Sequence, residues 1–229
     1  MILDANFEQR KEDVETHFRC LSFIDSIETH KGIPVRDPSS GNELQVDQQM
    51  QCCIKAQTLV LLYNMVESTI CDCLNYIYDA VADDGLIYAD LTNEMRNMWT
   101  ASCRRAKKPE KDLDESSKMP LLAVFETVAI NTSGSIDIRK IYDAFEKHGC
   151  KIIEDKREEC GLSFLTVKSK RNLLAHGNVS FSQCGAGYSF NDLVKMKGEI
   201  TVFLGIVIEA TKKFVDKKRY KRELKQDWY

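Results

Sequence analysis

A seven-residue stretch in the C-terminal third of the chain, Arg171–Gly177 (RNLLAHG), combines side chains that could act on a phosphodiester. The guanidinium of Arg171 is a planar, permanently charged fork that suits phosphate oxygens. The imidazole of His176 titrates near neutral pH and can carry a proton to or from a reacting group. On an α-helix, at about 100° per residue, Arg171, Asn172 and His176 spread over one arc of about 140°, with the small Ala175 between them. We expect this arc to form a seat for a phosphate group.

A structural interpretation of the same residues stays open. Arg and His are favoured near the C-terminus of any helix because cations complement the helix dipole. Asn172 could equally be a core amide whose hydrogen bonds go to backbone.

The helix that positions these residues is expected from about Cys160 to His176. Gly177 is expected to end it, because glycine takes positive φ without strain. The apolar positions of this helix are predicted to be Leu162, Leu165, Leu173 and Leu174, and Leu173 and Leu174 are expected to anchor the side opposite the polar arc in a core.

A longer helical pattern, from about Val46 to Ala82, is apolar almost all round and should be buried on several sides. Asn64 and Glu67 lie within it, three residues apart and therefore on one face. Burying such groups unpaired is costly. Glu67 could pair with Arg171 or orient His176, or both residues could face solvent or the backbone of another helix.

The rest of the chain also predicts helices, and no alternation long enough for a sheet is present. Helices are expected at about residues 6–29, 86–102, 121–129, 138–147 and 190–217, with Ser189 or Asn191 capping the last. Residues 31–44 read as a loop, 103–119 as a charged connection or insert, 179–181 as a short extended piece and 185–187 as a tight loop. We expect a single all-α domain over residues 1–229.

Composition favours a globular protein in a reducing compartment. The chain has 229 residues, of which 43% are hydrophobic and 29% charged, enough for a sizeable core. Nine cysteines is an odd count, and the N-terminus turns acidic at once rather than forming a secretory leader. Reduced thiols and a cytoplasmic location are therefore expected. No apolar run is long enough to cross a bilayer, so no membrane contact is expected.

The net charge of −3 does not by itself indicate a class of binding partner, but the charges are unevenly distributed along the chain. Residues 211–225 hold eight Lys or Arg against two acidic residues, and we treat 211–229 as a basic C-terminal tail. Lys168 and Lys170 run directly into the heptapeptide and are the predicted nucleic-acid contacts. Such runs bind nucleic acid in some proteins and are only solvated helix ends in others.

Metal chemistry finds little support. Cys71 and Cys73 would point about 200° apart on a helix, so they cannot share an ion. No C-x-x-C pair and no glycine-rich phosphate loop is present. We predict no metal and no cofactor.

The heptapeptide resembles the signature of the HEPN superfamily, often written R-N-x-x-A-H-G. The matching positions are Arg171, Asn172, Ala175, His176 and Gly177. More of the chain resembles the stand-alone prokaryotic HEPN-like nucleases of the MAE type. The further similarities are an N-terminal amphipathic helix (Phe7–Ile27), a Tyr63-Asn64-x-x-Glu67-Ser68 stretch and a turn at Ser133–Asp137.

This resemblance implies an all-α bundle with a four-helix core and extra helices, and a metal-independent endoribonuclease. The 2′-hydroxyl of RNA, with tRNA as one candidate substrate, would attack the adjacent phosphate and leave a 2′,3′-cyclic phosphate. His176 would be the general acid or base and Arg171 would stabilise charge on the phosphorane. Asn172 would hold His176 or a phosphate oxygen, with Glu67 and Asn64 in support.

The resemblance also implies a homodimer. The reaction needs a general acid and a general base, each chain supplies one histidine at the motif, and a two-fold axis would bring the histidine of a second chain to the same site. Some HEPN toxins carry a tyrosine two residues after the histidine that a partner enzyme modifies; Asn178 stands there in this chain. A role in bacterial defence or toxin-type growth arrest is expected, with a restraining partner protein left open. The alternatives are a non-catalytic HEPN module that binds RNA or nucleotide or scaffolds a defence complex, and a plain helical dimerisation protein.

Overall fold

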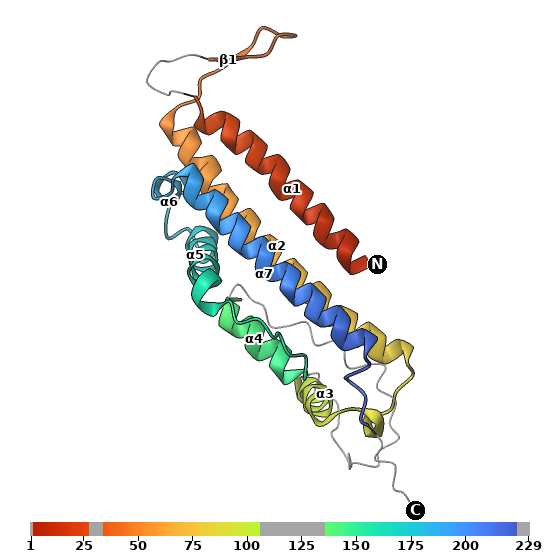
Figure 1. Ribbon diagram of the computed structural model, residues 1–229. Helices are drawn as coiled ribbons and strands as arrows, with labels where there is room; N and C mark the ends of the chain where they lie inside the picture. Colours follow the sequence, from red (N-terminus) through yellow and green to blue (C-terminus); the bar gives the residue numbers. More distant parts are fainter. Residues whose placement is uncertain (1, 28–33, 106–135, 224–229) are drawn as a thin grey trace, which may run out of the picture.

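The computed structural model describes residues 2–27, 34–105 and 136–223, and these ranges are almost entirely helical (Figure 1). The helices are α1 (Ile2–Asp25), α2 (Gln48–Asp83), α3 (Asn93–Arg105), α4 (Ile138–Lys147), α5 (Arg157–Ala175), α6 (Phe181–Gly185) and α7 (Phe190–Asp216). Two strands of two residues each, β1 (Val35–Arg36) and β2 (Glu43–Leu44), pair antiparallel inside the expected loop. The predicted all-α fold with little sheet is confirmed.

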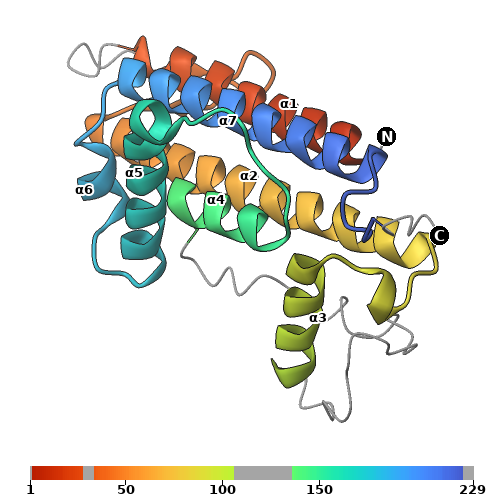
Figure 2. The same ribbon diagram turned by 60° about the horizontal axis from the view of Figure 1, so that its bottom comes forward.

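The core of the molecule is built from α1, α2, α5 and α7. The long helices α1, α2 and α7 run side by side, and α5 packs against both α2 and α7 (Figures 1 and 2). Because α2 contacts helices on several sides, its apolar residues are buried almost all round, as its composition predicts. The buried set from α2 includes Leu59, Leu62, Tyr63, Val66, Ile70, Cys73, Leu74 and Ile77.

The segment after α5 departs from the prediction. Residues 181–185 are the helix α6, so the predictions of an extended Phe181 and of Gly185 in a loop are wrong, whereas residues 186–187 form a turn as predicted. Ser180 and Gln183 form a capping box that starts this helix. Gly185 ends it against α2, where an added Cβ would lie 1.7 Å from the carbonyl oxygen of Cys52. Gly185 is therefore required for close packing of two helices rather than for a turn.

The third helix also begins later than predicted, at Asn93 instead of residue 86. A 3₁₀ turn at Tyr88–Asp90 precedes it. The buried Arg96 stabilises this turn, because its guanidinium donates to the carbonyls of Tyr88 (3.1 Å) and Ala89 (2.6 Å). The helix continues to Arg105, into the predicted insert. The rest of that insert and the predicted helix 121–129 lie outside the described residues.

Residues 211–223, which belong to the basic C-terminal tail, pack against the rest of the chain. Residues 211–216 are the last turns of α7, and the chain then folds back on the end of α2. Tyr220 is buried there and its hydroxyl donates to Asp84 at 2.9 Å, while Lys218 forms an ion pair with the same carboxylate at 2.7 Å. Residues 224–229 lie outside the described ranges.

Candidate functional site

The end of α5 has the geometry that its sequence predicts. His176 is the C-cap, and Gly177 follows with a φ of +68°. The amide of Gly177 donates to the carbonyl of Leu174 (3.1 Å) and that of Asn178 to the carbonyl of Leu173 (2.9 Å). These two bonds are those of a Schellman motif, which needs a residue with positive φ at the glycine position. The helix therefore ends with the His176 side chain at its rim.

Arg171 projects from α5 onto α2. Its guanidinium carbon lies 4.9 Å from the centre of the Tyr63 ring, and its Nη2 lies 3.8 Å from Oε2 of Glu67. Nη1 donates to Oδ1 of Asn172 at 3.3 Å. The side chains of Arg171 and Glu67 are 27% and 23% exposed, so the pair is partly shielded but open to solvent on one side. A guanidinium has five N–H donors, so several stay available for a phosphate.

Tyr63 is a residue of the site that has no predicted role, although it lies in the stretch that carries the family resemblance. It is fully buried, and its hydroxyl accepts a hydrogen bond from the backbone N–H of Ile136 at 3.2 Å. Burial raises the pKa of this phenol above its usual value, so it stays neutral beneath the guanidinium. A neutral aromatic face attracts a cation. The signal in the sequence is the position of Tyr63, one helical turn before Glu67.

Lys168 is held by a carboxylate instead of being free at the surface. Its ammonium donates to Oδ2 of Asp137 at 2.6 Å, and the other oxygen of Asp137 accepts from the amide of Lys140 and caps α4. Burial works against the charged form of Asp137, but the Lys168 and amide hydrogen bonds outweigh it and lower its pKa. Lys168 therefore joins α5 to α4, and its contact with RNA stays a prediction. Lys170 is partly buried and lies near the Cys184 thiol of α6.

His176 and Asn64 stand apart from this cluster. Both are exposed, and within the described ranges no hydrogen bond links either side chain to Arg171 or Glu67. Of the two roles open to Glu67, the structure places it beside Arg171 and not beside His176. Within one chain, Arg171 therefore faces α2 while His176 faces solvent.

The prediction of which α5 leucines face the core is partly wrong. Of the two leucines expected in the core, Leu174 is buried but Leu173 is 36% exposed, and Leu162 and Leu165 are exposed as well, at 73% and 50%. The core-facing side of α5 is supplied instead by Cys160, Ser163, Phe164, Val167 and Leu174. We call Leu162, Leu165 and Leu173 the α5 stripe. It runs along the exposed side of the helix toward His176.

No group of three or more His, Cys, Asp or Glu side chains gathers into a metal-binding arrangement among the residues that the structure describes. Within the same ranges, none of the helices combines the length and the apolar character that crossing a bilayer requires. A family model described as MAE_28990-like HEPN matches residues 3–220 of the chain. No curated protein and no solved structure matches it.

Proposed function

The chain belongs to the MAE_28990-like HEPN family, and on this premise we propose that it is a metal-independent endoribonuclease. The observation that supports the proposal most strongly is how the side chain of Arg171 is held. A guanidinium stacked on a buried tyrosine and flanked by a carboxylate is fixed in place, yet it keeps donors free toward solvent. His176, five residues further on, is exposed and free to exchange a proton with a substrate.

The proposed reaction needs no metal. The 2′-hydroxyl of RNA loses its proton and attacks the neighbouring phosphorus, and the 5′-oxygen leaves with a proton. The products are a 2′,3′-cyclic phosphate and a 5′-hydroxyl. His176 moves one of these protons, a contribution of about 10²–10⁴-fold for a positioned acid or base. Arg171 stabilises the charge that develops on the phosphorane oxygens, and Asn172 steadies the guanidinium.

Glu67 and Tyr63 act through Arg171. A carboxylate at 3.8 Å orients the guanidinium without the short, direct contacts that would occupy its donors. The Tyr63 ring limits the guanidinium to one plane. We therefore propose both as positioning residues, and Asn64, which is exposed on α2 three residues before Glu67, as an outer contact of the site.

We propose that the active form is a homodimer joined through the α5 stripe. A two-fold axis along this exposed side buries three leucines from each chain, and it brings the His176 of a second copy toward the first. The dimer then supplies both an acid and a base to one groove. Lys168 and Lys170 flank this groove, where RNA, with tRNA as one candidate, is expected to lie.

The proposed biological role rests on membership of the HEPN family. A nuclease of this kind would act in bacterial defence or toxin-type growth arrest in the cytoplasm, held in check by a partner protein. Asn178 stands where some relatives carry a modifiable tyrosine, so restraint by modification of that residue is not part of the proposal.

The first experiment measures cleavage of total tRNA and of a single-stranded RNA in EDTA. Wild type is compared with Arg171→Ala and His176→Ala, and the product ends are identified. Arg157→Ala is a matched control, because Arg157 is also on α5 and also stacks on a tyrosine, at 4.2 Å from the Tyr142 ring, outside the site. We expect cleavage to cyclic phosphate by wild type and Arg157→Ala, and a loss of at least 100-fold in the other two. Equal cleavage by all four proteins would refute the assignment.

The dimer is tested by Leu165→Glu, with Val194→Glu as the control. Both residues are exposed and apolar, at 50% and 38%, but Val194 lies on α7 outside the α5 stripe. Sedimentation should show a dimer for wild type and Val194→Glu, and a monomer without cleavage activity for Leu165→Glu. A dimeric Leu165→Glu variant would place the interface elsewhere. Binding of RNA by a dimeric wild type that never cleaves would favour a binding module instead.

A further inference from the structure

Ile136 and Asp137, the last two residues of the Ser133–Asp137 stretch, join the start of α4 to both helices that carry the candidate site. The backbone N–H of Ile136 donates to the hydroxyl of Tyr63 on α2 at 3.2 Å. Oδ2 of Asp137 accepts a hydrogen bond from the ammonium of Lys168 on α5 at 2.6 Å. The proposed reaction assigns no role to Asp137, although its carboxylate occupies a cation of the site.

Two cations of α5 lie one helical turn apart and are held in different ways. Lys168 precedes Arg171 by three residues, so the two side chains project from the same side of the helix. Nη2 of Arg171 is 3.8 Å from Oε2 of Glu67, which is longer than a hydrogen bond. The 2.6 Å between Lys168 and Asp137 is instead a short, charge-assisted hydrogen bond. Arg171 is therefore open to a phosphate, whereas Lys168 is occupied.

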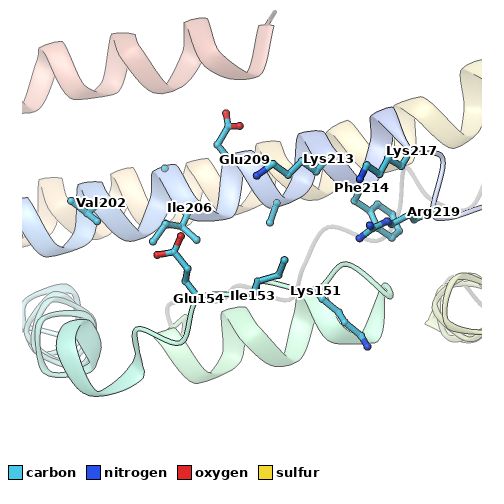
Figure 3. Close-up of a pocket in the computed structure, with 12 residues that line it drawn as sticks. Lys151, Ile153, Glu154, Val202, Ile206, Glu209, Lys213, Phe214, Lys217 and Arg219 are labelled. Atoms are coloured by element: carbon cyan, nitrogen blue, oxygen red, sulfur yellow. The ribbon is translucent and has the colours of Figure 1, made fainter.

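The pair of Lys168 and Asp137 is also shielded from solvent. Its two side chains are only 19% and 20% exposed. Lys213 and Lys217, beside the groove at the end of α7, differ from Lys168 because both are exposed and neither pairs with a carboxylate among the described residues (Figure 3). Solvent and salt screen exposed charges strongly and shielded pairs much less. The carboxylate is therefore an effective competitor for the Lys168 ammonium.

Asp137 has other partners, so the start of α4 does not depend on Lys168. Its Oδ1 accepts from the backbone amide of Lys140 at 3.1 Å and caps α4, and the charge of Lys140 also stabilises the carboxylate. Ile136 and Ile138 on either side are buried, at 5% and 3% exposed. A change that removes only the charge of Asp137 should therefore free the lysine and leave α4 in place.

We propose that Asp137 withholds Lys168 from RNA and so limits how tightly the candidate site binds its substrate. This inference rests on the proposed function, because it takes the α5 cluster as the place where RNA binds. The carboxylate and an RNA phosphate compete for one ammonium, so in the wild-type complex RNA contacts Arg171 and not Lys168. The flexible four-carbon stem of lysine lets its ammonium turn toward a phosphate beside Arg171 once the carboxylate has lost its charge.

Asp137→Asn tests the proposal, because Asn caps a helix as well as Asp does but carries no charge. The probe is a labelled, 2′-O-methylated single-stranded RNA, which lacks the attacking hydroxyl, and its binding is followed by anisotropy over a series of salt concentrations. We expect Asp137→Asn to bind about threefold or more tightly than wild type, with a slope of log affinity against log salt steeper by about 0.7, as one added phosphate contact predicts. Asp137→Ser, which also caps, should behave in the same way, and thermal melts check that each variant folds.

Two further variants show whether the gain comes from Lys168. Asp155→Asn is the matched control, because Asp155 also pairs with a cation, Arg157 at 3.1 Å, and accepts from a backbone amide, but it lies outside the site. It should change neither the affinity nor the salt slope. Asp137→Asn combined with Lys168→Gln should bind RNA as wild type does. The proposal is overturned if Asp137→Asn gains nothing, if Asp155→Asn gains as much, or if the double variant keeps the gain.

The same variants distinguish this inference from the proposed nuclease activity, which is measured separately on unmodified RNA. A gain in affinity for Asp137→Asn in a protein that never cleaves RNA would support the withheld lysine and overturn the nuclease. Cleavage by wild type without any gain for Asp137→Asn would do the reverse. RNA that binds neither wild type nor Asp137→Asn would overturn both proposals.

Discussion

Replacing Tyr63 in two ways separates its two contacts. Tyr63→Phe removes only the hydroxyl, so the ring stays beneath Arg171, while the backbone N–H of Ile136 loses its acceptor. That N–H is buried, and leaving such a donor unsatisfied costs about 1–3 kcal/mol. Tyr63→Leu removes the hydroxyl and the ring together. It adds the loss of a cation–π contact, about 0.5–2 kcal/mol, and a cavity in the core.

The expected results differ between stability and cleavage. Urea unfolding should show Tyr63→Phe less stable than wild type by about 1–3 kcal/mol, a fall in Tm of roughly 2–4 °C for each kcal/mol. Its single-turnover cleavage of RNA should stay within about threefold of wild type, because the ring still positions Arg171. Tyr63→Leu should be less stable still and should lose at least tenfold in the cleavage step, since one lost contact of about 1.4 kcal/mol is a factor of ten.

Tyr142 provides the control for a merely structural effect. It is buried, its ring lies 4.2 Å from the guanidinium carbon of Arg157, and its hydroxyl accepts from the amide of Lys156 at 2.9 Å. Tyr142→Leu should destabilise the protein and leave cleavage by the folded fraction unchanged. The positioning role of Tyr63 is refuted if Tyr63→Leu cleaves like wild type, or if Tyr63→Phe loses as much cleavage as Tyr63→Leu.

Two further predictions concern the fold. Gly185→Ala should destabilise the protein by more than 2 kcal/mol, because its Cβ would lie 1.7 Å from the Cys52 carbonyl oxygen; thermal melts should show little change for the control Gly187→Ala, whose Cβ meets nothing closer than 3.7 Å. Buried His148, bonded to the Tyr78 hydroxyl at 2.6 Å, has its pKa lowered by desolvation, so the unfolded chain binds the proton more readily. The contribution of His148 to the free energy of unfolding should therefore be complete above about pH 6.5 and should fall below it by up to about 1.4 kcal/mol per pH unit. Urea unfolding measured at several pH values should show a weaker dependence of this free energy on pH for His148→Gln than for wild type.

The main helices are predictable because their ends carry local signals. Helix α4 runs from Ile138 to Lys147 as predicted, since Asp137 caps its first turn and Gly149 takes positive φ after its last. Helix α7 begins where Ser189 caps it, one of the two positions predicted. These signals depend on residues close in sequence, so they are readable without the fold.

The errors come from contacts that are distant in sequence. The glycines near residue 185 read as a loop, because the carbonyl of Cys52 that Gly185 packs against lies more than a hundred residues earlier. Leu173 reads as a core residue because periodicity identifies an apolar position but not what covers it. The pairing of Lys168 with Asp137 is equally invisible, since it depends on how α4 meets α5.

The same limit explains why the candidate site is only half predictable. Arg171 and His176 can be identified from a short stretch of α5, but the Schellman turn and the wheel angle of about 140° between them point the two side chains in different directions. Arg171 is fixed by residues of α2, which are part of the core of its own chain. His176 is exposed at the end of an apolar stripe that the same chain does not cover. In the proposed dimer, a second copy covers this stripe and brings its own His176 to the site. If the dimer is the active form, the cleavage rate measured in a dilution series should depend on the square of the protein concentration below the dimer dissociation constant, and a linear dependence would refute the proposed dimer.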